Sequence, residues 1–167
     1  MKKISLLFNF IFVFFTIPAW AELPSSFSLN VGVTAIAEEV GYSFGATTPY
    51  FINDKSALSF QYSQFRASAS STYSMIEVGA LNKFLSFDKV NTYFKGGSFY
   101  TMPGNPALKS DFGINFGFGA NIAANGDKFL FKAEIGYYYP LGTTTEQVAG
   151  QPFAQGAGIS LGFMYLL

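Results

Sequence analysis

Five charged residues interrupt stretches of apolar and small residues, and these five are the part of the sequence best suited to chemistry. They are Glu77, Lys95, Asp111, Lys132 and Glu134. Lys132 and Glu134 are two residues apart, so in an extended strand both side chains lie on the same face. There an amine and a carboxylate could act as an acid–base pair or form a salt bridge. Which of these applies depends on whether that face opens to a substrate.

The residue types that are missing exclude most other chemistry. The chain has no histidine and no cysteine, so a serine nucleophile would lack its usual base and thiolate metal sites are impossible. The glycine-rich residues 116–119 lack the helix and basic residue that complete a phosphate loop. The 10 basic and 10 acidic residues balance, which argues against nucleic-acid binding. We therefore expect no enzyme, no cofactor, no metal and no nucleic-acid partner.

The elements that must position these charges are strands. Residues 111–122 alternate phenylalanine and isoleucine at most even positions with Asp, Gly and Asn at odd ones, and a period of two is typical of a β-strand. Eight such segments of about ten residues occur. We expect them at residues 27–35, 40–47, 58–63, 76–80, 90–97, 111–122, 129–139 and 156–167. In the fourth and fifth segments Tyr73, Met75 and Phe99 fall on the polar side, and we expect bulges or register errors there.

Residues 1–21 are typical of an export signal. Lys2 and Lys3 precede a mostly apolar run, and Ala19 and Ala21 frame a small-x-small cleavage site. We expect cleavage after Ala21, which leaves residues 22–167 as one domain. An uncleaved anchor is the alternative, but the run is shorter than the roughly 20 apolar residues that a spanning helix needs.

The connectors between the segments fall into two sets. Three are short, at residues 53–55, 86–89 and 124–127, and three are longer, at residues 66–72, 101–110 and 141–154; a very short first connector near Glu38 and Glu39 is the exception. Short connectors at one end and long ones at the other are typical of outer-membrane barrels, whose periplasmic turns are short and extracellular loops long. Aromatic residues near segment ends suit the two interfacial belts. They are Tyr50, Phe51, Phe99, Tyr100, Tyr137, Tyr138 and Tyr139.

The apolar face must point outward in a closed barrel. An eight-strand interior is just wide enough to be filled by side chains, so about 40 apolar side chains would overfill it. Only 12% of the residues are charged, too few for a soluble exterior. All five charged residues fall on the Gly/Ser/Asn face. We expect them to line the lumen as a salt-bridge network, either structural or pore-lining.

Eight alternating strands behind an export signal resemble the small eight-stranded outer-membrane proteins of Gram-negative bacteria, such as OmpX, OmpW, the opacity-type proteins and the membrane domain of OmpA. The final strand resembles the signal that the barrel assembly machinery reads in that family, with Ser160, Gly162, Tyr165 and Leu167 in its places. Leu167 departs from the usual terminal phenylalanine. The resemblance implies an all-β, single antiparallel up-and-down eight-stranded transmembrane barrel in the outer membrane. Its partners would be outer-membrane lipid and the assembly machinery, and it would be a monomer.

Three functional classes remain. The first is a structural or surface-interaction protein that displays its long loops outside the cell. The second is a narrow porin-like channel for small solutes or ions, with the lumen charges selecting what passes. The third is a soluble, secreted, lipocalin-like ligand binder, which composition disfavours because its exterior would have to be charged. The sequence does not name a surface partner.

Overall fold

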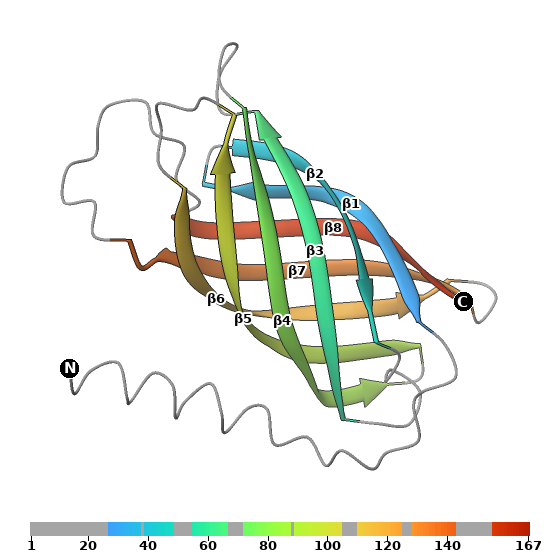
Figure 1. Cartoon of the computed structure of the whole chain (residues 1–167). Helices are drawn as coiled ribbons and strands as arrows, with labels where there is room; N and C mark the ends of the chain where they lie inside the picture. The colour runs from blue at the N-terminus through green and yellow to red at the C-terminus, as the bar shows by residue number, and fades with distance from the viewer. Residues whose placement is uncertain are drawn as a thin grey trace, which may run out of the picture.

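The computed structural model describes residues 27–37, 39–48, 55–66, 72–87, 89–104, 110–124, 128–142 and 155–167. Eight antiparallel strands close into one barrel in which each strand pairs with its neighbours in the chain, and β1 pairs with β8 (Figure 1). The strands are β1 (Ser28–Ile36), β2 (Glu39–Thr47), β3 (Ser56–Arg66), β4 (Thr72–Phe87), β5 (Val90–Pro103), β6 (Asp111–Ala123), β7 (Phe129–Pro140) and β8 (Gly156–Leu166). The predicted up-and-down topology is confirmed. Within the described residues no helix is long and apolar enough to cross a membrane.

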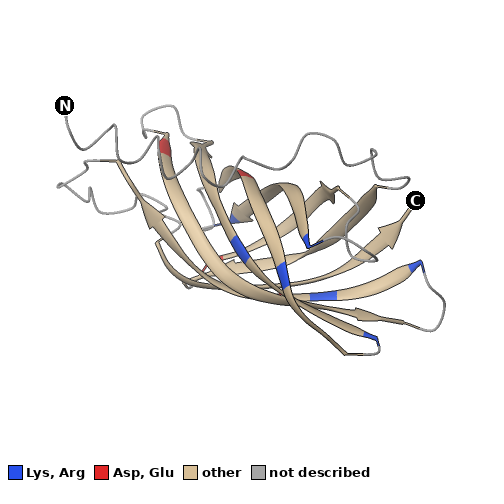
Figure 2. Cartoon of the chain, turned by 90° about the horizontal axis from the view of Figure 1, so that it is seen from below, with Lys and Arg blue, Asp and Glu red and all other residues tan. Residues whose placement is uncertain are grey.

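The outer wall is apolar on every strand. Along β6 the exposed residues alternate with buried ones through Phe118, and Phe112, Phe116, Phe131 and Phe163 are 36–63% exposed. Each strand contributes at least one such residue. Examples in strand order are Val31, Phe44, Phe60, Val78, Tyr100, Phe116, Ile135 and Phe163. The predicted orientation, with the apolar face outward, is therefore confirmed. Charged residues are sparse along the strands (Figure 2).

The expectation of bulges at Tyr73, Met75 and Phe99 is wrong. These residues keep regular register on long strands, β4 with 16 residues and β5 with 14, and their side chains point inward and are at most 2% exposed. The one register shift in β4 lies elsewhere, between Lys83 and Leu85. The interior therefore holds large aromatic side chains that residue type alone assigned to the outside.

Glycines on β6 make room for these rings. A Cβ atom added at Gly113 would overlap the ring of Phe99, and one added at Gly119 would overlap the ring of Tyr93. In both cases the glycine is on the strand next to the aromatic residue. Each ring occupies the space over a wall position that has no side chain, so a narrow barrel accommodates it without overpacking.

The connectors follow the predicted division between the two ends only in part, because the connector from β2 to β3, predicted to be short, spans residues 48–55 and is longer than the one at residues 67–71. The longer set falls largely on residues 67–71, 105–109 and 143–154, outside the described part of the chain, as do the predicted signal peptide and its Ala19 and Ala21. The first connector is confirmed as very short, although Glu39 already belongs to β2, and Ala37 turns with a positive φ of 54°. The short connector after β4 is shorter than predicted, because Ser86 and Phe87 still pair with β5.

Three of the seven residues predicted for the interfacial belts face outward. Tyr100, Tyr137 and Tyr139 are 40–50% exposed on the outer wall. Phe99 and Tyr138 point into the barrel instead, where they contact each other edge to face with ring centroids 5.6 Å apart. For these two the prediction was wrong, because aromatic character does not distinguish the two faces of a strand. Tyr50 and Phe51 lie outside the described residues.

Candidate functional site in the barrel interior

All five charged residues singled out from the sequence lie inside the barrel. Glu77 on β4, Lys95 on β5, Asp111 on β6, and Lys132 and Glu134 on β7 are each no more than 8% exposed. The alternation of each strand places them there, because they share the parity of the inward residues. The interior therefore concentrates charge that the outer wall lacks.

Four of the five are joined by ion pairs. Lys95 Nζ contacts Glu77 Oε1 and lies 3.2 Å from Glu134 Oε2, while Lys132 Nζ lies 3.1 Å from Glu134 Oε1. Two cations and two anions make this network formally neutral. Buried charges of opposite sign within this distance satisfy one another, as burial in a low-dielectric interior requires.

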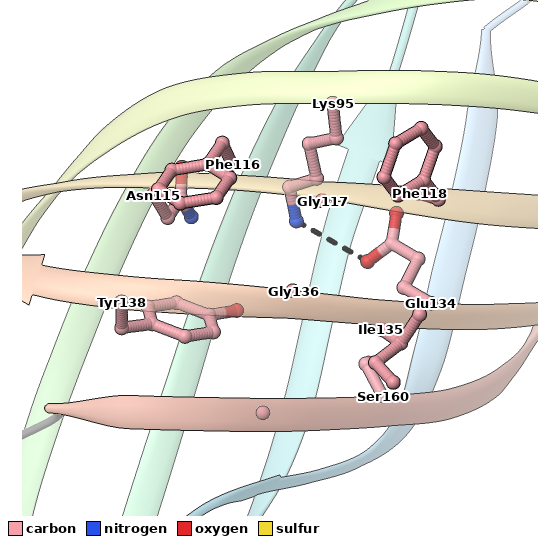
Figure 3. A pocket seen from close by; sticks show the side chains of 11 residues that line it. Lys95, Asn115, Phe116, Gly117, Phe118, Glu134, Ile135, Gly136, Tyr138 and Ser160 are labelled. Atoms are coloured by element: carbon pink, nitrogen blue, oxygen red, sulfur yellow. Dashed lines mark hydrogen bonds and ion pairs between the residues drawn. The ribbon is translucent and has the colours of Figure 1, made fainter.

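Glycines on β6 also let the network form. Lys95 is on β5 and Glu134 is on β7, so the strand between them must not obstruct their side chains. The β6 residues paired with them are Gly117, opposite Lys95, and Gly119, opposite Glu134. Neither has a side chain, so the ammonium and the carboxylate meet across β6 (Figure 3).

Tyrosines complete the hydrogen bonding of the carboxylates. Tyr138 Oη donates to Glu77 Oε2 at 3.1 Å, and Tyr93 Oη donates to Glu134 Oε1 at 2.8 Å. Nearer the loop end, Tyr73 Oη donates to Glu39 Oε2 at 2.6 Å. Sequence analysis missed these donors. The available signal was their inward parity, which they share with the charged residues of the same strands.

Asp111 lies apart from the four-residue network. Among the described residues it forms no ion pair, and its Oδ1 accepts a hydrogen bond from the backbone N of Phe112 at 2.8 Å. It is the first residue of β6, at the end where the longer connectors lie. The expectation that it belongs to one network with the other four therefore needs correction: it faces the lumen at a different level.

One apolar cluster lies at each end of this polar layer. The loop-side cluster consists of Ile36, Phe65, Tyr73, Met75, Phe99 and Tyr138. The turn-side cluster consists of Ala57, Leu81, Tyr93, Leu130 and Met164, with Ala123 and Leu166 packed against it. The lumen is therefore filled by side chains at three levels, with the ion pairs in the middle.

The interior leaves little space for a reactant. A cavity of about 20 Å³ lies among Lys95, Asn115, Glu134, Tyr138 and Ser160 (Figure 3). A space of this size holds about one water molecule. Within the described residues no group of three or more Asp, Glu, His or Cys is placed to hold a metal ion. The arrangement favours a salt bridge at Lys132 and Glu134 over acid–base catalysis.

The residues proposed for the assembly signal are on both faces of β8, which closes the barrel against β1. Ser160 is inside, with its Oγ 3.0 Å from Thr34 Oγ1. Gly162 is also on the inner side, while Tyr165 packs outside on Phe129 with ring centroids 4.8 Å apart and Leu167 is exposed.

No family model and no curated protein sequence matches the chain. Solved structures do match. The N-terminal β-barrel domain of Pseudomonas aeruginosa OprF is 18% identical with a TM-score of 0.59, covering 85% of this chain and 97% of that one. The Yersinia pestis outer membrane protein Ail, in a phospholipid nanodisc, is 14% identical with a TM-score of 0.55, covering 86% and 100%. A de novo designed transmembrane β-barrel is 14% identical with a TM-score of 0.57, covering 87% and 98%. The chain thus has the fold of the small eight-stranded outer-membrane β-barrels.

Proposed function

We propose that this protein is an integral outer-membrane β-barrel with a structural or surface-interaction role, whose longer loops face the outside of the cell. The observation that carries the proposal is the outer wall. Large apolar side chains on all eight strands are exposed around a closed sheet. An apolar surface of this extent needs a partner. Lipid is a suitable one, because closure leaves no strand edge with unpaired N–H and C=O groups.

The interior favours a structural role over a channel. Two apolar clusters lie above and below a neutral ion-pair network, and the cavity within it holds about one water molecule. A conducting pore would need a continuous wet path past Phe99 and Tyr93, which are at most 2% exposed. The porin-like alternative therefore has no observation in its favour. The lipocalin-like alternative would need its apolar face inside, which is opposite to the orientation of these strands.

An enzymatic role is not part of the proposal. Four of the five inward charged residues are paired with one another, and the space beside them is too small for a substrate. The solved structures with this fold are compatible with a non-catalytic barrel.

The route to the membrane is part of the proposal. An exported chain, cleaved after Ala21, would present β8 to the barrel assembly machinery through Ser160, Gly162, Tyr165 and Leu167, and would then act as a monomer in the outer membrane. Tyr165→Ala tests this step. We expect less folded protein in cells but normal folding from urea into detergent, because the change affects recognition more than the barrel itself. Equal losses in both settings would refute the assembly role.

Fractionation and conductance test the function together. We expect the mature protein in outer membranes, with different gel mobility before and after boiling, because a closed hydrogen-bonded sheet resists detergent. In planar bilayers we expect no single-channel steps from the wild type or from Lys132→Ala/Glu134→Ala. Soluble protein in the periplasm would refute the membrane role. Steps that change in the double variant would instead favour the channel.

A further inference from the structure

The inner face of β6 carries polar side chains that the described residues do not satisfy. Asp111 Oδ2 and both amide atoms of Asn115 and Asn121 are buried without a hydrogen-bond partner among the described residues. A buried amide that lacks both partners is destabilising, so native structures rarely leave one. Ordered water is the usual partner in such cases.

Of these three residues, Asn115 gives the strongest case for a bound water, because it lines a cavity. It is 5% exposed, and the cavity of about 20 Å³ lies beside its amide group, between β5, β6, β7 and β8 (Figure 3). The same space is lined by Lys95, Tyr138 and Ser160. Lys95 Nζ directs two of its three N–H groups to Glu77 and Glu134. Its third N–H is then available, and together with the hydroxyls the site offers the two to four polar partners that a buried water needs.

The size and charge of the site select the ligand. A volume of about 20 Å³ exceeds the roughly 10–15 Å³ that one water requires and leaves no room for a second. A metal cation would meet the ammonium of Lys95, and an anion would meet the carboxylate of Glu134. A neutral molecule that both donates and accepts fits where an ion of either sign does not.

Aromatic rings lie on both sides of this level. Phe99 lies over Gly113, which precedes Asn115 by one inward position of β6, and contacts Tyr138 edge to face. Tyr93 lies over Gly119, two inward positions beyond Asn115, and its hydroxyl is fixed by Glu134. Both rings are at most 2% exposed. Phe99 therefore lies on the Asp111 side of the Asn115 level, and Tyr93 lies on its Asn121 side.

We propose that the cavity beside Asn115 is a binding site for one long-lived internal water, held by Asn115 and Lys95 and separated from both ends of the barrel by Phe99 and Tyr93. This water completes the hydrogen bonding of the polar layer between the two apolar clusters. The inference goes beyond the proposed function and does not depend on the cellular location of the barrel. It can fail while the membrane role stands.

Water contacts at the Asn115 side chain test the proposal. In ¹⁵N-labelled full-length mature protein folded in micelles, we expect NOE and ROE cross-peaks of opposite sign between water and the Asn115 amide protons, the pattern of a water that tumbles with the barrel. Hydroxyl exchange could imitate this signal, so the measurement is repeated in Tyr138→Phe and in Ser160→Ala. Persistence in both variants supports the bound water, because each variant removes one of the two hydroxyls. Absence of the cross-peaks from the wild type, or their loss in either variant, overturns it.

The stability of Asn115→Leu gives an independent test, because a satisfied and an unsatisfied amide predict changes of opposite sign. If water satisfies the amide, Asn115→Leu loses those hydrogen bonds, and the unfolding equilibrium constant rises about tenfold. If the amide is unsatisfied, the same change removes two unmatched groups, and the constant falls. Asn82→Leu is the matched control, because the Oδ1 of Asn82 accepts from Ser56 Oγ at 2.8 Å near the rim. It should leave the Asn115 cross-peaks unchanged. If Asn115→Leu does not fold, the cross-peaks alone decide.

Discussion

Removing the ammonium of Lys95 is the sharpest perturbation of the interior. Lys95 contacts Glu77 and lies 3.2 Å from Glu134, and all three side chains are buried. In Lys95→Met, Glu134 keeps Lys132 at 3.1 Å, whereas Glu77 keeps only the hydroxyl of Tyr138 at 3.1 Å. One buried carboxylate therefore loses its counter-ion while the shape of the interior changes little.

The expected loss follows from that uncompensated charge. Breaking a buried ion pair from one side is destabilising by about 3–5 kcal/mol. Lys95→Met/Glu77→Gln removes both charges and restores neutrality. We expect its free energy of unfolding to lie within about 1 kcal/mol of the wild-type value, because a buried pair contributes little net stability. The comparison of the two variants separates charge imbalance from lost packing, since both carry the same methionine.

Equilibrium unfolding in urea, with the mature protein folded into lipid vesicles, measures both variants. Far-UV circular dichroism and the fraction of the unboiled gel band are the readouts, since the one tryptophan, Trp20, lies in the predicted signal peptide. A loss below about 1 kcal/mol for the single variant would place this pair in the range of solvent-exposed bridges. A double variant no more stable than Lys95→Met would equally refute the reasoning.

Three further predictions test the outer wall, the packing of the interior and the first turn. Phe116→Lys, in the middle of β6, should lower folding stability in vesicles by about 2–4 kcal/mol. Phe129→Lys, at the rim, should lower it by only about 0–1 kcal/mol, although the two phenylalanines are similarly exposed. Equal losses would contradict a bilayer around the outer wall. Gly119→Ala should be destabilising by about 1–3 kcal/mol in urea titrations because the added Cβ meets an inward ring, whereas Gly96→Ala, with its nearest atom 3.6 Å away, should be tolerated. Ala37→Gly should raise the free energy of unfolding in urea by about 0.5–1 kcal/mol, because glycine accepts the positive φ of this turn; a lower free energy of unfolding would show that the turn is unstrained.

The fold could be predicted because alternation is a local property. Along β6 from Phe112 to Phe118 one small or polar residue separates each outward Phe or Ile from the next, and the strand, its two faces and its orientation follow from those residues alone. Tyr73 and Phe99 share the inward parity of the charged residues on their strands, but their residue type favoured the outside. Whether the interior has room for such a ring depends on a neighbouring strand, as with Gly113 beside Phe99, and that pairing depends on register.

The interior charges illustrate the same limit. Parity alone put Lys95, Lys132 and Glu134 on the inward face, where the structure has them. Their partners depend on three strands at once, because Lys95 reaches Glu134 across the glycines of β6. Asp111 has the correct parity but lies at another level of the barrel. Periodicity determines the face, and only the three-dimensional register determines the neighbour.

A single-cysteine spin-label scan along β6 tests the outward orientation of the apolar face most directly. The chain has no native cysteine, so each residue from 111 to 123 can be labelled in turn in vesicle-embedded protein. We predict an oscillation of period two, in which the labels at even positions 112–118 and at 122 collide with oxygen, which partitions into lipid, and not with a water-soluble nickel complex. Collision of those same labels with the nickel complex would place the apolar face in water and contradict the account.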